Sequence, residues 1–120
     1  MLTAPEAEVM NVVWGAGETT IADIVDHIPR ELAYTTVMTT VRILEEKGFV
    51  KKRGKQGRAF LYAAAVDKAT ATSSMTHEVA SRLFAGSVKQ LMLSLLGDST
   101  VDADDLAEIR QVIEQLEAKS

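Results

Sequence analysis

The sequence contains no cysteine, which excludes disulfide bonds, a thiol nucleophile and metal sites built from thiolates. It also lacks any apolar run near the ~18 residues that a membrane-spanning helix needs. No basic start leads into an apolar segment of the kind found in signal peptides. Together these absences predict a cytoplasmic protein without membrane insertion.

The chain has 120 residues, of which 47% are hydrophobic, and this composition excludes wholesale disorder. The length suits one domain or two small lobes. Two lobes would each have a small core, and small cores often depend on oligomerisation. We find no internal repeat and no low-complexity tract.

Charge is distributed unevenly, although the formal net charge is only -4. Residues 42–58 contain seven basic and two acidic side chains, a net of +5. Residues 97–120 contain seven acidic and two basic side chains, a net of -5. The local net charge matters more for binding a polyanion than the net charge of the whole chain. The basic segment is therefore a candidate nucleic-acid surface.

Three helices are predicted in the first part of the chain. The first starts at Thr3, where Glu6 completes a capping box, and stops at the glycines after Trp14. The second runs from Thr20 to the residue before Pro29, and the third from Tyr34 to Lys47, before a glycine. The third helix has an apolar stripe of Val37, Val41 and Leu44, and its opposite side is rich in threonine.

A short β-hairpin should follow the third helix. Residues 49–53 and 59–63 are compatible with strands, and residues 54–58 form a basic, glycine-bracketed turn between them. Three helices followed by a basic hairpin is the order of a winged helix-turn-helix. The sequence therefore predicts a mainly α fold with a winged helix-turn-helix DNA-binding domain at residues 1–66.

Residues 67–120 are predicted to form a three-helix dimerisation lobe. One helix should end near Phe84, a second should carry an apolar stripe after Gly86, and a third should span Asp102 to Glu117. The last helix has 3-4-3 apolar spacing, as in a helix-pairing seam. Packing within one chain would also explain that seam, but the number of large aliphatics favours a homodimer. The expected contact residues are Val88, Leu91, Met92, Leu95, Leu106, Ile109, Ile113 and Leu116.

No residue pattern indicates catalysis, a metal site or a cofactor. Asp23 and His27 are one helical turn apart, but two ligands without cysteine are better explained as a solvated pair, and the same holds for His77 with Glu78. Ser73 and Ser74 lack a nucleophile-elbow motif, and no phosphate-binding glycine loop occurs. We therefore expect no enzyme.

The threonine-rich helix face and the basic hairpin together fit double-stranded DNA. Short hydroxyls and methyls suit phosphates, base edges and thymine methyls, and basic side chains suit the DNA backbone. A winged helix that docks an acidic protein partner is the alternative, and the threonine face argues against it. The expected DNA-binding residues are Tyr34, Thr35, Thr36, Met38, Thr39 and Arg42 on the helix and Lys52, Arg53, Lys55 and Arg58 on the hairpin.

Three segments resemble the penicillinase repressor family (BlaI/MecI/CopY type). Residues 2–14 follow the pattern Leu-Thr-x-x-Glu-x-x-Val-Met-x-x-Val-Trp, residues 33–39 read Ala-Tyr-Thr-Thr-Val-Met-Thr, and residues 46–50 read Glu-Lys-Gly-Phe-Val. The segment at 84–88 and the acidic last helix extend the resemblance over nearly the whole chain. The resemblance implies a dimeric repressor that binds a palindromic operator.

The resemblance also implies a mode of release. In well-known members a membrane sensor protease system triggers cleavage within the dimerisation lobe, and the corresponding bond here is Ser94–Leu95, where those members have asparagine before an aromatic residue. The cysteine-rich copper site of another branch is absent. The family's late Arg-Leu pair is replaced by Arg42-Ile43-Leu44, which shifts the arginine by one place.

Overall fold

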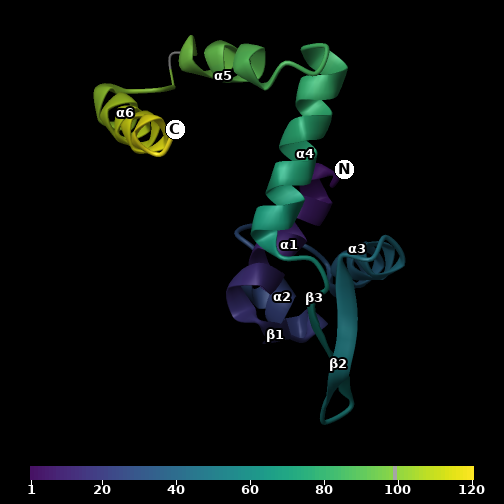
Figure 1. Ribbon diagram of the computed structural model, residues 1–120. Helices are drawn as coiled ribbons and strands as arrows, with labels where there is room; N and C mark the ends of the chain where they lie inside the picture. The colour runs from purple at the N-terminus through teal and green to yellow at the C-terminus, as the bar shows by residue number, and fades with distance from the viewer. Residues whose placement is uncertain (99) are drawn as a thin grey trace. The chain divides into compact units, whose positions relative to one another are not determined.

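Six helices and a small antiparallel sheet make up residues 1–98 and 100–120, the part of the chain that the computed structural model describes (Figure 1). The predicted mainly α class is confirmed. Contacts divide the chain into two compact units, Met1–Thr76 and His77–Ser120. The predicted domain boundary after residue 66 stays a prediction.

The helices are α1 (Ala4–Ala16), α2 (Ile21–His27), α3 (Tyr34–Glu46), α4 (Lys68–Leu83), α5 (Val88–Leu96) and α6 (Ala103–Ala118), and the strands are β1 (Glu18–Thr19), β2 (Val50–Gln56) and β3 (Ala59–Ala64).

The ends of α1 and α2 follow from local side-chain chemistry. The hydroxyl of Thr3 accepts a hydrogen bond from the Glu6 amide, and the Glu6 carboxylate accepts one from the Thr3 amide, which forms the predicted capping box. Gly17 ends α1 with φ of +81°, a conformation that favours glycine. Thr20 caps α2 by accepting a hydrogen bond from the Asp23 amide.

Apolar side chains of α1, α2 and α3 form the core of the first unit. Met10, Ile24, Val37 and Leu44 have no exposed surface. Burying a side chain of this size contributes roughly 1.5–3 kcal/mol. Because the buried residues of α3 lie on one stripe, this core holds α3 in place and leaves the opposite side of the helix to solvent.

Two polar contacts reinforce that core. Glu6 is 4% exposed, and its carboxylate accepts hydrogen bonds from the Thr3 amide (2.7 Å) and from Nζ of Lys47 (2.9 Å), which joins the start of α1 to the end of α3. Burial raises the pKa of Glu6, but these hydrogen bonds outweigh it and hold the pKa below the ordinary value of 4.5. Separately, Nε1 of Trp14 donates to the carbonyl oxygen of Val66 at 2.9 Å.

The sheet has the order β1-β3-β2, with antiparallel pairing throughout. The predicted hairpin is present as β2 and β3, but its turn is shorter than the five residues expected. The strands close on a two-residue turn at Gly57 and Arg58, because β2 continues to Gln56. Gly54 lies within β2 with φ of +114°, where the register shifts. The short strand β1 was not predicted.

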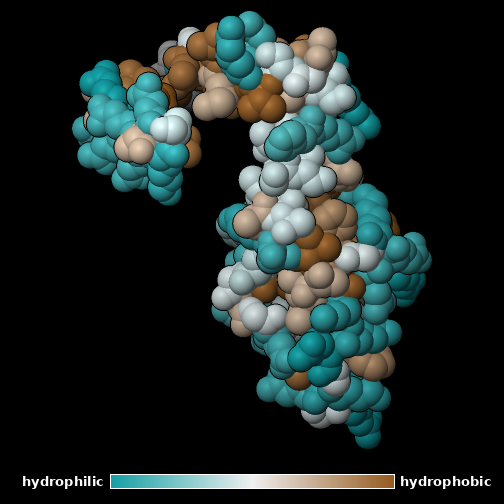
Figure 2. All heavy atoms as spheres, viewed as in Figure 1, coloured by the Kyte–Doolittle hydropathy of each residue, from teal (hydrophilic) through white to brown (hydrophobic). Residues whose placement is uncertain are grey.

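The second unit has little core of its own. Ser87 caps α5, and Asp102 and Asp105 form a capping box on α6. Within this unit Ala80 and Leu91 are buried, whereas α6 has no buried residue. Apolar residues gather on the surface over α5 (Figure 2).

None of the helices in residues 1–98 and 100–120 has the length and apolar character to cross a membrane.

Candidate nucleic-acid interface

The side of α3 opposite its buried stripe is exposed and carries most of the predicted helix contacts. Tyr34, which is 51% exposed, Thr35, Thr36, Thr39 and Arg42 all lie on the surface. Met38, by contrast, is half-buried and packs against the core of the first unit. Met38 therefore helps to hold α3 in place and offers only part of its side chain to a ligand.

Hydrogen bonds along α3 determine which donor and acceptor groups its threonine side chains can present to a ligand. Oγ1 of Thr39 donates to the carbonyl oxygen of Thr35 at 2.9 Å, and Oγ1 of Thr40 donates to that of Thr36 at 3.0 Å. The hydroxyl proton of Thr39 is thus already used, which leaves its methyl group and oxygen lone pairs for a partner. Thr39 is suited to contact a thymine methyl or to accept from a base amine.

The start of α3 has no side-chain cap. Ala33 occupies the N-cap position, and the first turn contains no acidic residue. In contrast, Thr3, Thr20, Ser87 and Asp102 cap α1, α2, α5 and α6. Because the positive end of the α3 dipole is not compensated by a carboxylate, this end of the helix favours an anion such as phosphate.

A groove lies between α3 and the hairpin of β2 and β3, which we call the wing. Its volume is about 340 Å³. It brings together five of the predicted DNA-binding residues, whereas Thr35, Thr36, Thr39, Arg53 and Lys55 do not line it. The lining residues are Tyr34, Met38, Arg42, Lys52 and Arg58 from the predicted set, with Ile21, Ala22, Glu45, Ala59, Phe60 and Tyr62.

Charged side chains of α3 and the wing differ in how they are paired. Nζ of Lys52 is 4.0 Å from a carboxylate oxygen of Glu45, and Nε of Arg53 is 3.9 Å from one of Glu18. Both ion pairs are exposed and contribute little to stability. Arg42, Lys55 and Arg58 form no ion pair within residues 1–98 and 100–120. These three cations are available to an anionic ligand without breaking an ion pair.

Tyr62 forms part of the floor of the groove and is 8% exposed. Burial raises the pKa of its phenol, and the negative charge of Glu45 raises it further. The phenol therefore stays neutral around pH 7. It adds no negative charge that would repel a phosphate.

Sequence reasoning missed six residues that line the groove, and two of them, Glu45 and Phe60, bear directly on its charge and surface. Glu45 entered the sequence analysis only as one of the two acidic side chains of residues 42–58, although it pairs with Lys52. Phe60 was predicted only as a strand residue, but it is 41% exposed and lines the groove. The sequence signal that bears on Phe60 is Gly54, which lies within a basic run. A glycine within a strand can mark a bulge, and a bulge changes which residues of the two strands face each other.

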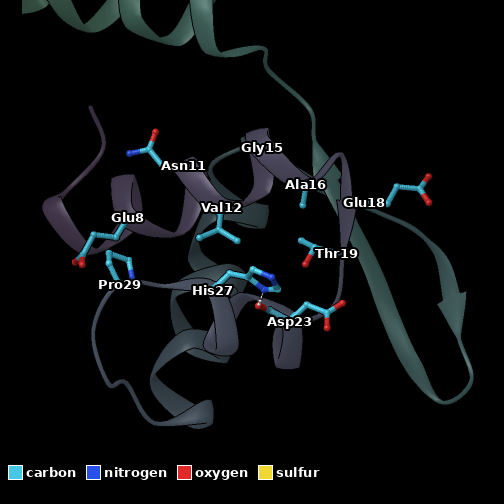
Figure 3. A pocket seen from close by; sticks show the side chains of 10 residues that line it. All are labelled: Glu8, Asn11, Val12, Gly15, Ala16, Glu18, Thr19, Asp23, His27 and Pro29. Atoms are coloured by element: carbon cyan, nitrogen blue, oxygen red, sulfur yellow. Dashed lines mark hydrogen bonds between the residues drawn. The ribbon is translucent and has the colours of Figure 1, made fainter.

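A second hollow, of about 780 Å³, lies between α1, β1 and α2. Val12 and the ring of His27 face this space (Figure 3). The Nδ1–H of His27 donates to the carbonyl oxygen of Asp23 (2.7 Å), and Glu8 accepts two hydrogen bonds from Arg30. The side chains of His27 and Glu8 are therefore engaged with the protein. Within the described ranges no three His, Cys, Asp or Glu residues are placed to hold a metal ion.

Three packed helices, a small sheet and an exposed helix face beside a cationic wing define a winged-helix DNA-binding protein. A family model described as "Penicillinase repressor" matches residues 2–115. The chain therefore belongs to the penicillinase repressor family, as the three motifs indicated. It is a DNA-binding transcriptional repressor and not an enzyme.

Two known proteins are similar to the chain over most of its length. The chain is 22% identical over 120 residues to the penicillinase repressor of Staphylococcus aureus, covering 98% of this chain and 94% of that protein. It is 29% identical over 114 residues to an uncharacterised 16.5 kDa protein of Latilactobacillus sakei, covering 93% and 77%.

Solved structures show the same fold. The DNA-binding domain of the repressor BlaI matches with a TM-score of 0.52 and 24% identity, over 58% of this chain and 87% of that one. The reduced form of MarR from E. coli matches with a TM-score of 0.51 and 15% identity, over 96% and 77%.

Proposed function

We propose that the chain represses transcription as a homodimer that binds a palindromic operator, with α3 in the major groove and the wing on the adjacent DNA backbone. The observation that carries this proposal is the groove in which Tyr34 and Arg42 of α3 face Lys52 and Arg58 of the wing. One duplex lying against this side could contact both elements. As a DNA-binding protein, the repressor would act in the cytoplasm.

Different residues would contribute affinity and sequence preference. Thr35, Thr36 and Thr39 would contact base edges, thymine methyls or phosphates near the start of α3, and Arg42 a phosphate or a guanine. Contacts to phosphate by the wing would add affinity without sequence preference. The wing contacts are Lys52, Arg53, Lys55 and Arg58.

Selection of bound duplexes from a random DNA pool tests the palindromic operator. The enriched sequences should contain two inverted half-sites whose centres lie about 10 base pairs apart, or a multiple of that, since each head of a dimer reads one half-site. Binding should weaken steeply with salt, by a slope of about 0.9 per phosphate contact. A pool without inverted symmetry, or binding that ignores salt, would contradict the proposal.

Dimerisation is supported by the apolar surface of the second unit. Met92 is 49% exposed, Leu95 57%, Ile113 45% and Leu116 61%, and Val88 and Leu106 are also exposed. Exposed large apolar side chains on two helices are typical of an interaction site, and a second copy of the chain carries the same side chains. Leu91 is already buried and Ile109 is half-buried, so these two side chains would contribute less surface to the dimer contact than the exposed ones.

Substitutions at exposed positions test the dimer better than substitutions at Leu91, which would also disturb the chain itself. Ile113→Glu should give monomers in sedimentation experiments and weaken operator binding, because two linked heads bind more tightly than one. Arg110→Glu, which changes charge on the same helix without removing an apolar side chain, is the matched control. Ile113→Glu protein that still sediments as a dimer would remove Ile113 from the contact.

We further propose release by proteolysis at Ser94–Leu95, on the basis of the resemblance to repressors controlled by a membrane sensor protease. Both residues are exposed on α5. Because a protease needs an extended backbone, α5 would have to unwind locally first, which a nine-residue helix ending at Gly97 permits at low cost. Co-expression with a matching sensor protease should cut the chain between Met92 and Gly97. A chain left intact there would contradict this mode of release.

A further inference from the structure

Phe60 of β3 has two lysine side chains over its ring. Nζ of Lys52 is 4.4 Å from the ring centroid, and Nζ of Lys55 is 4.9 Å from it. Both distances lie within the ~6 Å range in which an ammonium group is attracted to an aromatic face. Phe60 itself is 41% exposed, so this cluster sits at the surface.

A bulge in β2 creates the cluster. Lys52 pairs with Tyr62 and Lys55 pairs with Phe60, so two residues of β2, Arg53 and Gly54, lie opposite one residue of β3. Paired residues of antiparallel strands point to the same face of the sheet, and so do residues two apart on one strand. Both lysines therefore share a face with Phe60 and Tyr62.

Without the extra residue the wing would present a different surface. Gly54 would pair with Phe60, and Lys55 would shift to the opposite face with Ala59. The observed face is the one that borders α3, because Lys52, Phe60 and Tyr62 line the groove with Arg42. The bulge thus places both ammonium groups on the side of the wing where the proposed function puts DNA.

We propose that Phe60 is a positioning residue for DNA binding, whose ring orders the ammonium groups of Lys52 and Lys55 before they meet the DNA backbone. This inference rests on the proposed function. Ordering one long side chain on binding lowers affinity by a factor of about 2 to 12, and a ring that orders it beforehand avoids that loss. Each ammonium group has three N–H donors, so it can contact a phosphate while it stays over the ring.

Two substitutions of Phe60 separate its aromatic face from its bulk. Phe60→Leu keeps an apolar side chain but removes the ring, and should weaken binding about three- to tenfold per half-site. The loss should be equal for a duplex selected by the wild-type protein and for a mixed-sequence duplex, since backbone contacts carry no sequence information. Phe60→Tyr keeps the ring and should bind within about twofold of wild type. Both variants should keep the wild-type midpoint of thermal unfolding.

A double-mutant cycle tests whether the effect passes through the two lysines. In a background with Lys52→Met and Lys55→Met, Phe60→Leu should cause no further loss of affinity. In a Lys51→Met background the full loss should remain, because Lys51 pairs with Ala63 and points to the other face.

Three results would overturn the proposal: Phe60→Leu binding as tightly as wild type, Phe60→Tyr binding as weakly as Phe60→Leu, or an undiminished Phe60→Leu effect without the lysines. Wild-type protein that binds neither duplex would instead contradict the proposed function.

Discussion

Replacement of Arg42 by alanine should weaken DNA binding without affecting the fold. Arg42 is exposed on α3, lines the groove and forms no ion pair within the described part of the chain. Its removal therefore leaves no carboxylate unpaired and no cavity. We expect the free energy of unfolding in urea to change by less than about 0.5 kcal/mol, as for other surface substitutions.

The size of the binding effect distinguishes two kinds of contact. If Arg42 contacts a guanine, its loss should cost about 1–3 kcal/mol per half-site and relax preference at one base position. If it contacts a phosphate, binding to all sequences should weaken alike. The slope of log K against log salt should then fall by about 1.8, since a dimer loses two contacts of about 0.9 each.

Fluorescence anisotropy with a labelled, selected duplex over a range of salt concentrations measures both effects. Lys51→Ala is the control, because it removes a positive charge from the face of the wing away from α3. Equal affinities of Arg42→Ala and wild type, with equal salt slopes, would refute the assignment of α3 as the element that reads DNA.

Three further predictions concern assembly and stability. Leu95→Glu should shift the sedimentation coefficient from dimer to monomer, because it places a charge on an exposed apolar surface. Glu6→Gln should destabilise the fold by about 1–3 kcal/mol at neutral pH in urea unfolding, since it removes the charge that Lys47 contacts. Because the pKa of Glu6 is lowered on folding, its contribution is fully present above 4.5 and is lost as pH falls through the folded pKa, so wild type and variant should converge in acid. Trp14→Phe should cost about 0.5–1.5 kcal/mol by the same assay, because the half-buried carbonyl oxygen of Val66 loses its donor. Variants as stable as wild type would contradict the last two.

Most helices of this chain were predictable because most of their ends carry a strong local signal, although the uncapped start of α3 does not. Thr3 and Thr20 are good caps, Gly17 and Gly48 adopt positive φ at helix ends, and Pro29 follows α2. These signals act over three or four residues, which is the range that a sequence pattern covers. The exposed face of α3 was predictable for the same reason, from the spacing of its buried residues.

The sheet and the groove were harder to predict because they depend on contacts between segments far apart in sequence. The two residues of β1 are too few for a periodic pattern, and they are a strand only because β3 pairs with them. Gly54 signals a turn as readily as a bulge, and only pairing with β3 decides between them. The ion pair between Glu45 and Lys52 likewise follows from how α3 packs against β2.

Titration of the isotopically labelled protein with a selected duplex, followed by amide chemical shifts in NMR spectra, tests the central claim most directly. The account predicts that the largest shifts occur at residues 34–42 of α3 and residues 52–60 of the wing, with little change around the hollow between α1 and α2. Largest shifts around that hollow, with residues 34–42 and 52–60 unchanged, would contradict it.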